Sequence, residues 1–459
     1  MTIMKVAPKN IVKEVKNGKV TIAVIGLGWM GLPIACLFAD KGARVIGVDI
    51  NQKIVDTISR GNCPNPELNL PNILNKVTRN RKFRATRSLS RAISRSQVIF
   101  ITVPTSIDNL GKSDYTILEK VCKEIGKKIQ KYSLVILEST VAPTITERVV
   151  KSTIEKHSGL KAGIDFGLAY SPIRAMGGNV LKNLRSYNKI VGAIDKKSLD
   201  IASLIHSVIV EGKIIKVKDL ITAEASKIFE TIYRDVNIAL ANELAIFCEK
   251  AKIDFMEAKH AANTQPYSNL HTPSIGVGGH CLPIYPYMLL TESNFLEVPL
   301  KVVKEGRKIN ENMPKHTARL IANGLRTCGK ALKRSKVTIL GISYRPDIKE
   351  VRFSPSLELI KILKRRGCRT TVYDPMFSHS EIEKMGFKTE TALKRTFEKS
   401  DCVVIAVAHK EFKILNPQEI AMHSSMPCVI VDGAHIFNSK NVEKLGMIYR
   451  GIGRGIWKK

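Results

Sequence analysis

The sequence predicts an α/β protein in which two doubly wound, parallel domains are joined by a central helical region. Two sets of apolar, β-branched-rich runs carry this prediction, because strands of a parallel sheet are buried on both faces. Between the sets, residues 222–260 contain almost no Gly or Pro, which indicates helix. A chain of 459 residues is too long for one core. We expect three domains, at residues 1–215, 216–325 and 326–459.

The runs are short and separated by helical patterns, as in a doubly wound sheet. The first set comprises Val20–Gly26, Ala43–Asp49, Gln97–Pro104, Ser133–Thr140, Asp165–Pro172, Asn188–Ala193 and Lys213–Lys218. The second set comprises Lys336–Tyr344, Arg369–Pro375, Asp401–His409 and Cys428–Gly433. Helical patterns extend from Thr222 to His260 and from Pro299 to Cys328.

A glycine fingerprint, Gly26-Leu-Gly28-Trp-Met30-Gly31, follows the first run and opens a helix. The first glycine permits a tight turn, the second lets backbone approach a pyrophosphate, and the third lets helix pack on strand. Asp49 ends the second run, where its carboxylate would accept hydrogen bonds from a ribose diol and repel a 2′-phosphate. The first domain is therefore predicted to be a Rossmann-like site for NAD rather than NADP. Glycines that serve an ordinary tight turn are the alternative.

Thr105 and Thr140 close the next two runs and are expected at the same crevice. The second α/β domain lacks the fingerprint, since only Gly341 follows its first run. From its residues alone, it could bind a nucleotide through other contacts or serve as a structural cap.

The composition argues against several classes of protein, including nucleic-acid-binding, secreted and membrane-spanning proteins. Lys and Arg number 73 against 41 Asp and Glu, a formal charge of +32 that attracts anions such as nucleotide cofactors. The basic run Asn75–Arg95 matches no nucleic-acid module, so a solvated basic surface is favoured over a nucleic-acid site. No signal-like apolar core or run of 18 apolar residues occurs. Nine scattered cysteines fit reduced thiols, and no metal-like spacing is present. We expect a cytoplasmic protein without metal, nucleic-acid partner or membrane anchor.

Cys281 lies in the stretch Gly276–Tyr287, GVGGHCLPIYPY. Three glycines and two prolines make this a loop rather than a helix or central strand, and they would bring backbone close to a ligand. The thiolate form of cysteine is a nucleophile. Cys281 is therefore a candidate catalytic residue, with a buried inert thiol as the alternative.

A polar stripe marks the long helical stretch. Lys227, Thr231 and Arg234 are spaced i, i+4 and i+7, and Asn237 lies near the edge of the same face. This predicts a binding face on which Lys227 steadies a developing oxyanion. The alternative is a solvated face with an Arg234–Glu230 ion pair.

Together, the fingerprint, this helix and the cysteine loop resemble the UDP-glucose/GDP-mannose dehydrogenase family over nearly the whole chain. KIFETIYRDVNIALANE resembles the central substrate-binding helix of the family. LGISYRPDIKEVRFSPSLEL (Leu340–Leu359) resembles the opening of its nucleotide-binding C-terminal domain. The GGHC form of the loop is similar to that of members that act on UDP-N-acetylhexosamines. The resemblance implies an NAD-binding first domain, a central domain with the cysteine loop and a dimer interface, and a UDP-sugar-binding third domain.

The resemblance also implies a four-electron oxidation of a sugar C6 alcohol to a carboxylate with two NAD. Cys281 would trap the aldehyde as a thiohemiacetal and then carry a thioester, while Lys227 and Thr231 would assist. Substrate contacts are expected from a further set of residues: Arg174, Arg234, Asn237, Gly276, Gly278, Gly279, His280, Tyr285, Arg307 and Arg352. Cofactor contacts are expected from Gly26, Gly28, Met30, Gly31, Asp49, Thr105 and Thr140.

Three positions depart from the family pattern. Its Ser-Pro-Glu segment is Ser171-Pro172-Ile173-Arg174 here, so a carboxylate often assigned general-base work is missing. A lysine, His280 or a positioned water could replace it. The family has an asparagine four residues after the lysine, where this chain has Thr231. It has an aspartate four residues after the cysteine, where this chain has Tyr285.

The expected substrate is UDP-N-acetyl-D-mannosamine, and the product would supply surface polysaccharide or glycan synthesis. UDP-N-acetylglucosamine is the second candidate substrate, since it differs by one stereocentre. The sequence also leaves open a two-electron β-hydroxyacid dehydrogenase and an inactive nucleotide-sugar-binding protein. Members usually dimerise through the central region, so a homodimer or higher homo-oligomer is expected.

Overall fold

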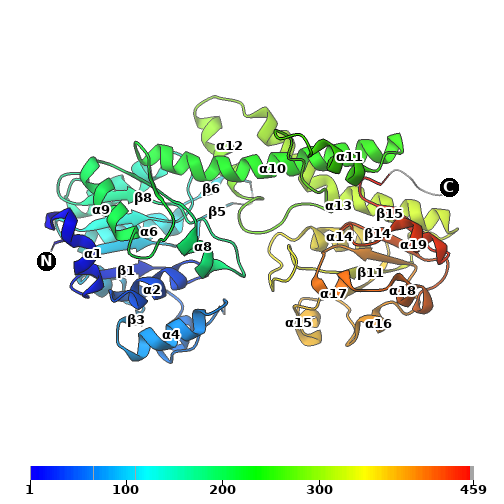
Figure 1. The fold of residues 1–459 in the computed structure, drawn as a ribbon, viewed down its shortest axis with the longest axis horizontal. Coiled ribbons are helices and arrows are strands. Elements are labelled where there is room, and N and C mark those ends of the chain that lie inside the picture. Colours follow the sequence, from blue (N-terminus) through cyan, green and yellow to red (C-terminus); the bar gives the residue numbers. More distant parts are fainter. Residues whose placement is uncertain (1, 66, 109, 455–459) are drawn as a thin grey trace. The chain divides into compact units, whose positions relative to one another are not determined.

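The computed structural model describes residues 2–65, 67–108 and 110–454, and it forms two compact units (Figure 1). The first unit contains residues 1–230 and 287–297, and the second contains residues 231–286 and 298–459. The outermost positions of the predicted domain ranges, residues 1 and 455–459, lie outside the described residues. The predicted three-domain boundaries stay a prediction.

The first unit is built on an eight-stranded sheet with the order β10-β9-β8-β7-β4-β1-β2-β3. Its strands are β1 (Thr21–Ile25), β2 (Arg44–Val48), β3 (Phe83–Thr86), β4 (Val98–Ile101), β7 (Leu134–Leu137), β8 (Gly167–Tyr170), β9 (Lys189–Ala193) and β10 (Ile214–Lys216). All neighbours are parallel except the β8–β9 pair. A separate antiparallel pair is formed by β5 (Ser106–Ile107) and β6 (Ser113–Asp114).

Helices of the first unit form two packed groups, as expected for a sheet covered on both faces. One group contains α1 (Pro8–Lys16), α2 (Gly31–Asp40), α4 (Leu70–Arg79), α8 (Val180–Ser186) and α9 (Lys196–His206). The other contains α5 (Leu89–Ser94), α6 (Thr116–Lys128), the π-helical η2 (Thr146–Lys151) and α7 (Ser152–Ser158). The short η1 (Ile3–Lys5) and α3 (Gln52–Ser59) complete this part.

The second unit contains a five-stranded parallel sheet with the order β12-β11-β13-β14-β15. Its strands are β11 (Lys336–Leu340), β12 (Arg369–Tyr373), β13 (Cys402–Ile405), β14 (Val429–Asp432) and β15 (Ile448–Gly451). Alternate strand residues face two separate cores, so Val404 packs in one and Val403 in the other. The sheet is therefore doubly wound, as predicted.

Two long helices and several short ones accompany this sheet (Figure 1). The long ones are α10 (Leu220–Ala251), which begins in the first unit and continues in the second, and α13 (Lys301–Thr327). The others of the second unit are α11 (Phe255–Ala262), α14 (Pro355–Arg365), α15 (His379–Lys384), α16 (Leu393–Thr396), α17 (Lys410–Lys413), α18 (Pro417–His423) and α19 (Ser439–Lys444). Helix α12 (Tyr285–Phe295) begins at the end of a second-unit segment, but its residues from 287 onward belong to the first unit.

The predicted fold class is confirmed, and each predicted run contains a strand. The helical stretch predicted from Thr222 to His260 is confirmed except at residues 252–254, where it is interrupted. Helix α10 ends at Ala251, Lys252 adopts a left-handed φ of 60°, and α11 begins at Phe255. Asp254 causes the new start, because its side chain accepts hydrogen bonds from the amides of Met256 and Glu257. Strands β3, β5, β6 and β15 were not predicted.

A buried ion pair joins α10 to α13 within the second unit. Nη1 of Arg307 lies 2.6 Å from Oδ1 of Asp235, and the two side chains are 2% and 0% exposed. Asn310 donates to the same carboxylate oxygen at 2.9 Å. Burial raises the pKa of Asp235, and the Arg307 guanidinium opposes this shift. Removing one partner would leave a buried, uncompensated charge, which is costly.

We predict that Asp235→Ala lowers the free energy of unfolding by about 3–5 kcal/mol, because Arg307 then stays buried without its counter-charge. Chemical denaturation followed by circular dichroism measures the change. The matched control is Glu305→Ala, which removes an exposed pair with Lys308 on the same helix α13. The control should cost less than about 1 kcal/mol. Equal losses in the two variants would contradict the structural role of the buried pair.

Candidate active site

The glycine fingerprint forms the turn between β1 and α2. Gly26 has a φ of 96°, which confirms the need for glycine at the turn. A Cβ on Gly31 would lie 1.9 Å from the carbonyl oxygen of Gly26, so the predicted close packing of helix on strand is also confirmed. A Cβ on Gly28 would meet no atom within 4 Å. Met30 stands just before α2, so the glycine turn lies at a helix N-terminus. This open turn at a helix N-terminus fits the pyrophosphate of a dinucleotide.

Asp49 follows β2 and braces the same turn. Its Oδ2 accepts a hydrogen bond from the amide of Leu27 at 2.9 Å, and its Oδ1 accepts from the amide of Asn51 at 2.9 Å. Each carboxylate oxygen can accept a second hydrogen bond. The ribose contact of Asp49 therefore stays a prediction that the geometry permits.

Thr105 and Thr140 come together after β4 and β7. Oγ1 of Thr105 donates to the carbonyl oxygen of Thr140 at 2.7 Å, and Oγ of Ser139 donates to the carbonyl oxygen of Val103 at 2.6 Å. Thr102 donates to the carbonyl oxygen of Gly26 at 2.9 Å. These bonds tie the loops at the carboxyl edge of the sheet to the glycine turn.

A buried ion pair that the sequence did not predict lies next to this edge. Nζ of Lys189 on β9 is 2.6 Å from Oε1 of Glu138 and donates to the carbonyl oxygens of Ser171 and Pro172 at 3.3 Å. Burial raises the pKa of Glu138, with Lys189 opposing the shift, and burial likewise lowers the pKa of Lys189. The pair fixes the start of the Ser171–Arg174 segment.

Lys227 lies on the part of α10 that belongs to the first unit. Its Nζ is 2.9 Å from Oε1 of Glu230, and Nε of Arg174 is 3.0 Å from Oε2 of the same carboxylate. The structure thus brings together two predicted site residues, Lys227 and Arg174, through an acid that was not singled out. The alternative in which Glu230 pairs with Arg234 is wrong, because both Glu230 oxygens bond to Lys227 and Arg174.

The rest of the predicted polar stripe lies on α10 within the second unit. Thr231 is buried and Arg234 is exposed. Asn237 uses its amide to donate to the carbonyl oxygen of Tyr233 at 2.6 Å, one turn back on its own helix. Burial lowers the pKa of His271, and the nearby positive charges of Arg234 and Lys259 lower it further. The substrate roles of these residues stay predictions.

Cys281 presents an exposed thiol, as predicted for a reactive cysteine. All nine cysteines lie among the described residues, and the other eight are buried or partly buried. The Cys281 sulfur is 3.5 Å from the hydroxyl of Tyr285. The carbonyl oxygen of Cys281 accepts from the amides of Ile284 and Tyr285, so the residue opens a turn that leads into α12. The surroundings therefore leave this sulfur accessible to a ligand.

Both ring nitrogens of His280 have hydrogen-bond partners. Its Nε2 lies 3.1 Å from Oε2 of Glu350, and its Nδ1 lies 3.1 Å from Nη1 of Arg352. Because a guanidinium can only donate, Nδ1 accepts and the ring proton sits on Nε2, which donates to Glu350. The amide of Gly279 also donates to the carbonyl oxygen of Arg352 at 3.1 Å. With both nitrogens engaged, His280 is poorly placed to replace the missing carboxylate at Ile173.

The glycines of the loop pack tightly within the second unit. A Cβ on Gly278 would lie 2.6 Å from the carbonyl oxygen of Phe353, and a Cβ on Gly279 would lie 2.6 Å from the Tyr344 ring. A Cβ on Gly276 would lie 2.9 Å from Pro355. The glycines thus allow the loop to approach the protein itself, while their contact with a substrate stays a prediction.

The base of the loop is held by buried asparagines. Asn242 on α10 accepts from the amide of Ser274 at 2.9 Å and donates to Asn310 on α13 at 2.9 Å. Arg307 donates to the carbonyl oxygen of Leu282 at 3.5 Å, besides its pair with Asp235. Arg307, predicted to contact substrate, is therefore a buried support of the cysteine loop, and substrate contact stays untested.

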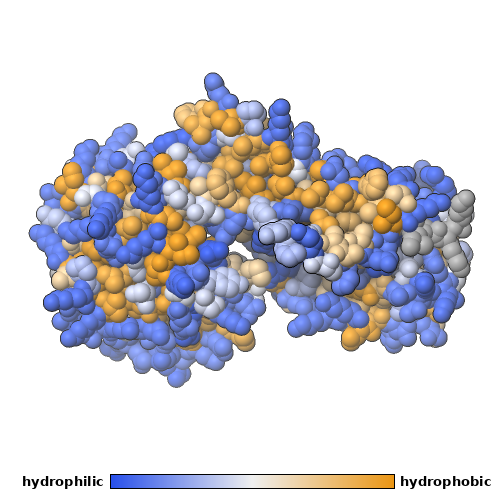
Figure 2. All heavy atoms as spheres, turned by 45° about the horizontal axis from the view of Figure 1, so that its top comes forward, coloured by the Kyte–Doolittle hydropathy of each residue, from blue (hydrophilic) through white to orange (hydrophobic). Residues whose placement is uncertain are grey.

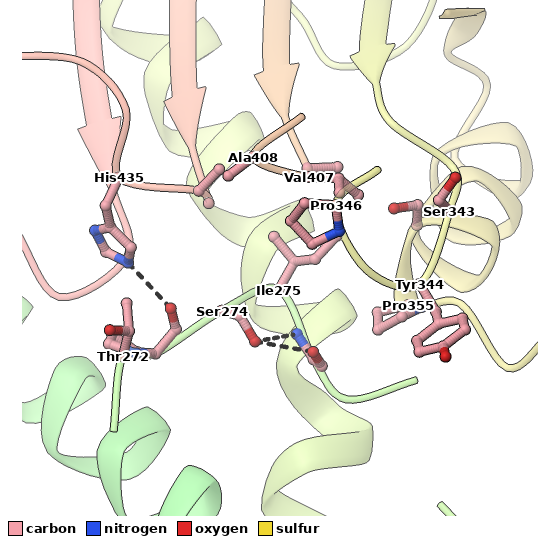
Figure 3. Close-up of a pocket in the computed structure, with 16 residues that line it drawn as sticks. Thr272, Ser274, Ile275, Ser343, Tyr344, Pro346, Pro355, Val407, Ala408 and His435 are labelled. Atoms are coloured by element: carbon pink, nitrogen blue, oxygen red, sulfur yellow. Dashed lines mark hydrogen bonds between the residues drawn. The ribbon is translucent and has the colours of Figure 1, made fainter. Parts of the chain in front are cut away.

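A pocket of about 220 Å³ opens at the carboxyl edge of the second sheet (Figure 3). Loops after β11, β13 and β14 line it, together with the segment before Cys281. His435 lies across the pocket from Ser343 and Tyr344, and Val407 and Ala408 come from the loop after β13 (Figure 3). The strand order changes direction between β11 and β13, which is where ligands of open α/β sheets bind. This is a candidate nucleotide pocket.

The second sheet has an acid at the position that Asp49 occupies in the first. Asp374 follows β12, and its Oδ2 accepts from the amides of Ile342 and Ser343 and the Ser343 hydroxyl, and faces Nε2 of His409 at 3.2 Å. Burial acts to raise the pKa of Asp374, but the hydrogen bonds outweigh it and the pKa lies below its usual value. Asp374 is only 1% exposed and its Oδ2 has four partners, so it offers no ribose contact like that predicted for Asp49.

Two absences hold for the residues that the structure describes. Among them, no three or more His, Cys, Asp or Glu side chains gather in a way that could hold a metal ion. No described helix combines the length and apolar character needed to cross a membrane.

We predict that Gly31→Ala destabilises the protein by about 3 kcal/mol or more, because the added methyl would collide with backbone. Gly28→Ala is the matched control, and it should change stability by less than about 0.5 kcal/mol. The control should nevertheless weaken NADH binding about tenfold or more, since its methyl enters the space predicted for the pyrophosphate. Denaturation and calorimetric titration measure the two effects. Unchanged NADH affinity in Gly28→Ala would contradict the assignment of the turn.

Comparison with known proteins covers most of the chain. Residues 20–210 match the NAD binding domain of the UDP-glucose/GDP-mannose dehydrogenase family, residues 221–312 its central domain and residues 338–439 its UDP binding domain. A UDP-N-acetyl-D-mannosamine dehydrogenase of Pyrococcus horikoshii is 34% identical over 95% of this chain and 99% of its own length.

Solved structures of nucleotide-sugar dehydrogenases superpose on nearly the whole chain. A UDP-D-ManNAc dehydrogenase from Pyrococcus horikoshii superposes with a TM-score of 0.87 at 33% identity, covering 95% of this chain and 100% of that one. An NDP-N-acetyl-D-galactosaminuronic acid dehydrogenase from Methanosarcina mazei Go1 superposes with a TM-score of 0.85 at 29% identity, covering 99% of each chain. The chain therefore belongs to the UDP-glucose/GDP-mannose dehydrogenase family and is an NAD-dependent nucleotide-sugar dehydrogenase.

Proposed function

We propose that the protein oxidises UDP-N-acetyl-D-mannosamine at C6 to UDP-N-acetyl-D-mannosaminuronate, using two NAD per sugar. The observation that carries this proposal is the exposed thiol of Cys281 in a firmly held loop. A four-electron oxidation needs a nucleophile that retains the substrate between its two steps, and a thiolate does so covalently. The choice of sugar rests on the Pyrococcus horikoshii relative and on the GGHC loop.

The proposed steps balance as one alcohol, two NAD and one water giving one carboxylate, two NADH and three protons. NAD, when bound in the first unit, accepts a hydride in each oxidation. The Cys281 thiolate adds to the C6 aldehyde, and the Lys227 ammonium steadies the oxygen that becomes negative. After the second oxidation the sugar is a thioester on Cys281. Attack by water breaks the C–S bond and releases the carboxylate and the thiolate.

We place the UDP group in the pocket that Figure 3 shows, because it lies at the carboxyl edge of the second sheet and the segment Thr272–Gly276, which leads into the Cys281 loop, forms one wall. Residues 338–439, which include most of its lining, match the UDP binding domain of the family. Arg352 is held near this loop through His280. The product would serve surface polysaccharide or glycan synthesis.

We predict that two NADH form for each UDP-N-acetyl-D-mannosamine consumed, since Cys281 carries the sugar through both oxidations. The test mixes the purified protein and NAD with UDP-linked N-acetyl-mannosamine, N-acetyl-glucosamine and N-acetyl-galactosamine in turn. The absorbance of NADH is counted against the sugar consumed. Faster turnover of another hexosamine would reassign the substrate but keep the reaction.

The matched variant is Cys281→Ser, with Cys63→Ser as the control because Cys63 is partly buried in the first unit. Cys281→Ser should still bind substrate but form no uronate, and Cys63→Ser should behave as the unmodified protein. Two NADH per sugar in Cys281→Ser would contradict covalent catalysis. One NADH per sugar in the unmodified protein would favour a two-electron dehydrogenase.

We also propose that the protein self-associates through α10. Tyr233, Leu240 and Phe247 are exposed and spaced by seven residues, so they follow one face of this helix within the second unit. Apolar side chains gather on the surface around α10 (orange, upper centre of Figure 2). Exposed apolar stripes of this kind mark association surfaces.

We predict that sedimentation reports at least a dimer, that is, two chains of 51.0 kDa each. Leu240→Glu should shift the protein toward monomer, because a charge would then be buried in the interface. The control is Ile414→Glu, an exposed apolar side chain beside α17 in the second sheet region. A monomeric unmodified protein would contradict the proposal, as would equal effects of the two substitutions.

A further inference from the structure

The segment that follows β8 lacks an acid but is firmly placed. Ile173 packs against the hydrophobic core of the first unit, so its alkyl side chain is part of the fold. Lys189 binds the carbonyl oxygens of Ser171 and Pro172, and the Ser171 hydroxyl donates to the carbonyl oxygen of Ile190 at 2.7 Å. This backbone has a fixed position, and no carboxylate comes from residue 173.

A carboxylate nevertheless lies beside this segment, and it comes from α10. Oε2 of Glu230 is 3.0 Å from Nε of Arg174, the residue directly after Ile173. Oε1 of Glu230 is 2.9 Å from Nζ of Lys227. The Glu230 side chain is 32% exposed, while Lys227 is only 11% exposed. One acid thus joins the lysine of the proposed reaction to the loop after β8.

Arg174 is itself held in place, since its Nη1 donates to the carbonyl oxygen of Asn188 at 3.2 Å. The chain of contacts therefore runs from the backbone before β9 through Arg174 and Glu230 to the Lys227 ammonium. A lysine side chain has four flexible bonds, and its ammonium is a point charge without preferred direction. Holding it at one place matters, because misplacing a catalytic group by about 1 Å costs on the order of 10²-fold in rate.

We infer that Glu230 is a positioning residue for the dehydrogenase reaction. It holds the Lys227 ammonium and ties it to Arg174, so that the site keeps a carboxylate next to a segment in which Ile173 supplies none. The competing role, a base that takes a proton from water, is less suited to an acid whose two oxygens each bond to a cation. This inference rests on the proposed function, in which Lys227 steadies the oxyanion.

The test compares Glu230→Gln with the unmodified protein. Glutamine has the same shape but no charge, so the hold on Lys227 and Arg174 weakens while the fold is kept. We expect kcat to fall on the order of 10²-fold with KM for the UDP-sugar changed less than about threefold. Glu124→Gln is the matched control, because Glu124 forms an exposed pair with Lys127 three residues away on α6 of the same unit. It should keep full activity.

A double-mutant cycle with Lys227→Ala separates positioning from a general structural role. If Glu230 acts through Lys227, Glu230→Gln should cause less than about twofold further loss of kcat once Lys227 is alanine. Independent, multiplying losses would overturn the inference. A rapid burst of two NADH per site followed by a stall in Glu230→Gln would also overturn it, since Glu230 would then act in thioester hydrolysis.

The two proposals fail in different ways. If the unmodified protein forms NADH with UDP-N-acetylhexosamines but Glu230→Gln keeps its kcat, only the role of Glu230 is refuted. If the unmodified protein oxidises none of these sugars, the proposed function is refuted and the role of Glu230 falls with it. Circular dichroism and NADH titration of each variant confirm that fold and cofactor binding are intact.

Discussion

The arrangement of the candidate site depends on how the loop before α12 is held. An exposed thiol on a glycine-rich loop is useful only if the backbone around it has one conformation, since loops are otherwise the mobile part of a fold. Here, His280 is fixed between Glu350 and Arg352, and Ser274 is bonded to buried Asn242. The glycines allow this tight packing because any Cβ would collide with neighbouring atoms. The exposed sulfur of Cys281 is thus presented by a firmly held loop.

The two units contribute different chemistry. The first carries the glycine turn for NAD, braced by Asp49, and the Lys227–Glu230–Arg174 contacts. The second carries the thiol and the pocket at the edge of its sheet. Both the cofactor and the proposed substrate bear phosphates, so a chain with a formal charge of +32 attracts each of them. Both units contain a doubly wound sheet. Because Asp374 is engaged internally, however, the second sheet would bind its ligand without the acid contact predicted for Asp49 in the first.

Much of the fold was predictable because each buried parallel strand appears in the sequence as a continuous apolar run. The unpredicted strands are those whose residues lack this pattern. β3 is FRAT at the edge of its sheet, and β15 is IYRG with Arg450 buried. β5 and β6 are only two residues long each, SI and SD. The end of α10 had a local signal in Asp254, a helix-capping residue in an otherwise unbroken helical pattern.

The local geometry of the candidate site was predictable where it follows a motif, as in the turn of Gly26 and Gly31 and in the exposure of Cys281. It was not predictable where partners are distant in the chain. The clamp on His280 uses Glu350, 70 residues away, and Glu230 meets Arg174 across 56 residues. Asp235, which neutralises Arg307, lies 72 residues before it. Helical spacing alone offered Arg234 as the partner of Glu230, and only the three-dimensional contacts show that Lys227 and Arg174 take that place.

The most direct test of the account is to look for the sugar on Cys281 during turnover. The unmodified protein, UDP-N-acetyl-D-mannosamine and NAD are mixed, quenched with acid within milliseconds, digested and analysed by mass spectrometry. We predict a uronyl adduct on the peptide that contains Cys281, and treatment with hydroxylamine should remove it as expected for a thioester. Uronate formation with no adduct on Cys281, or with the adduct on another residue, would contradict the account.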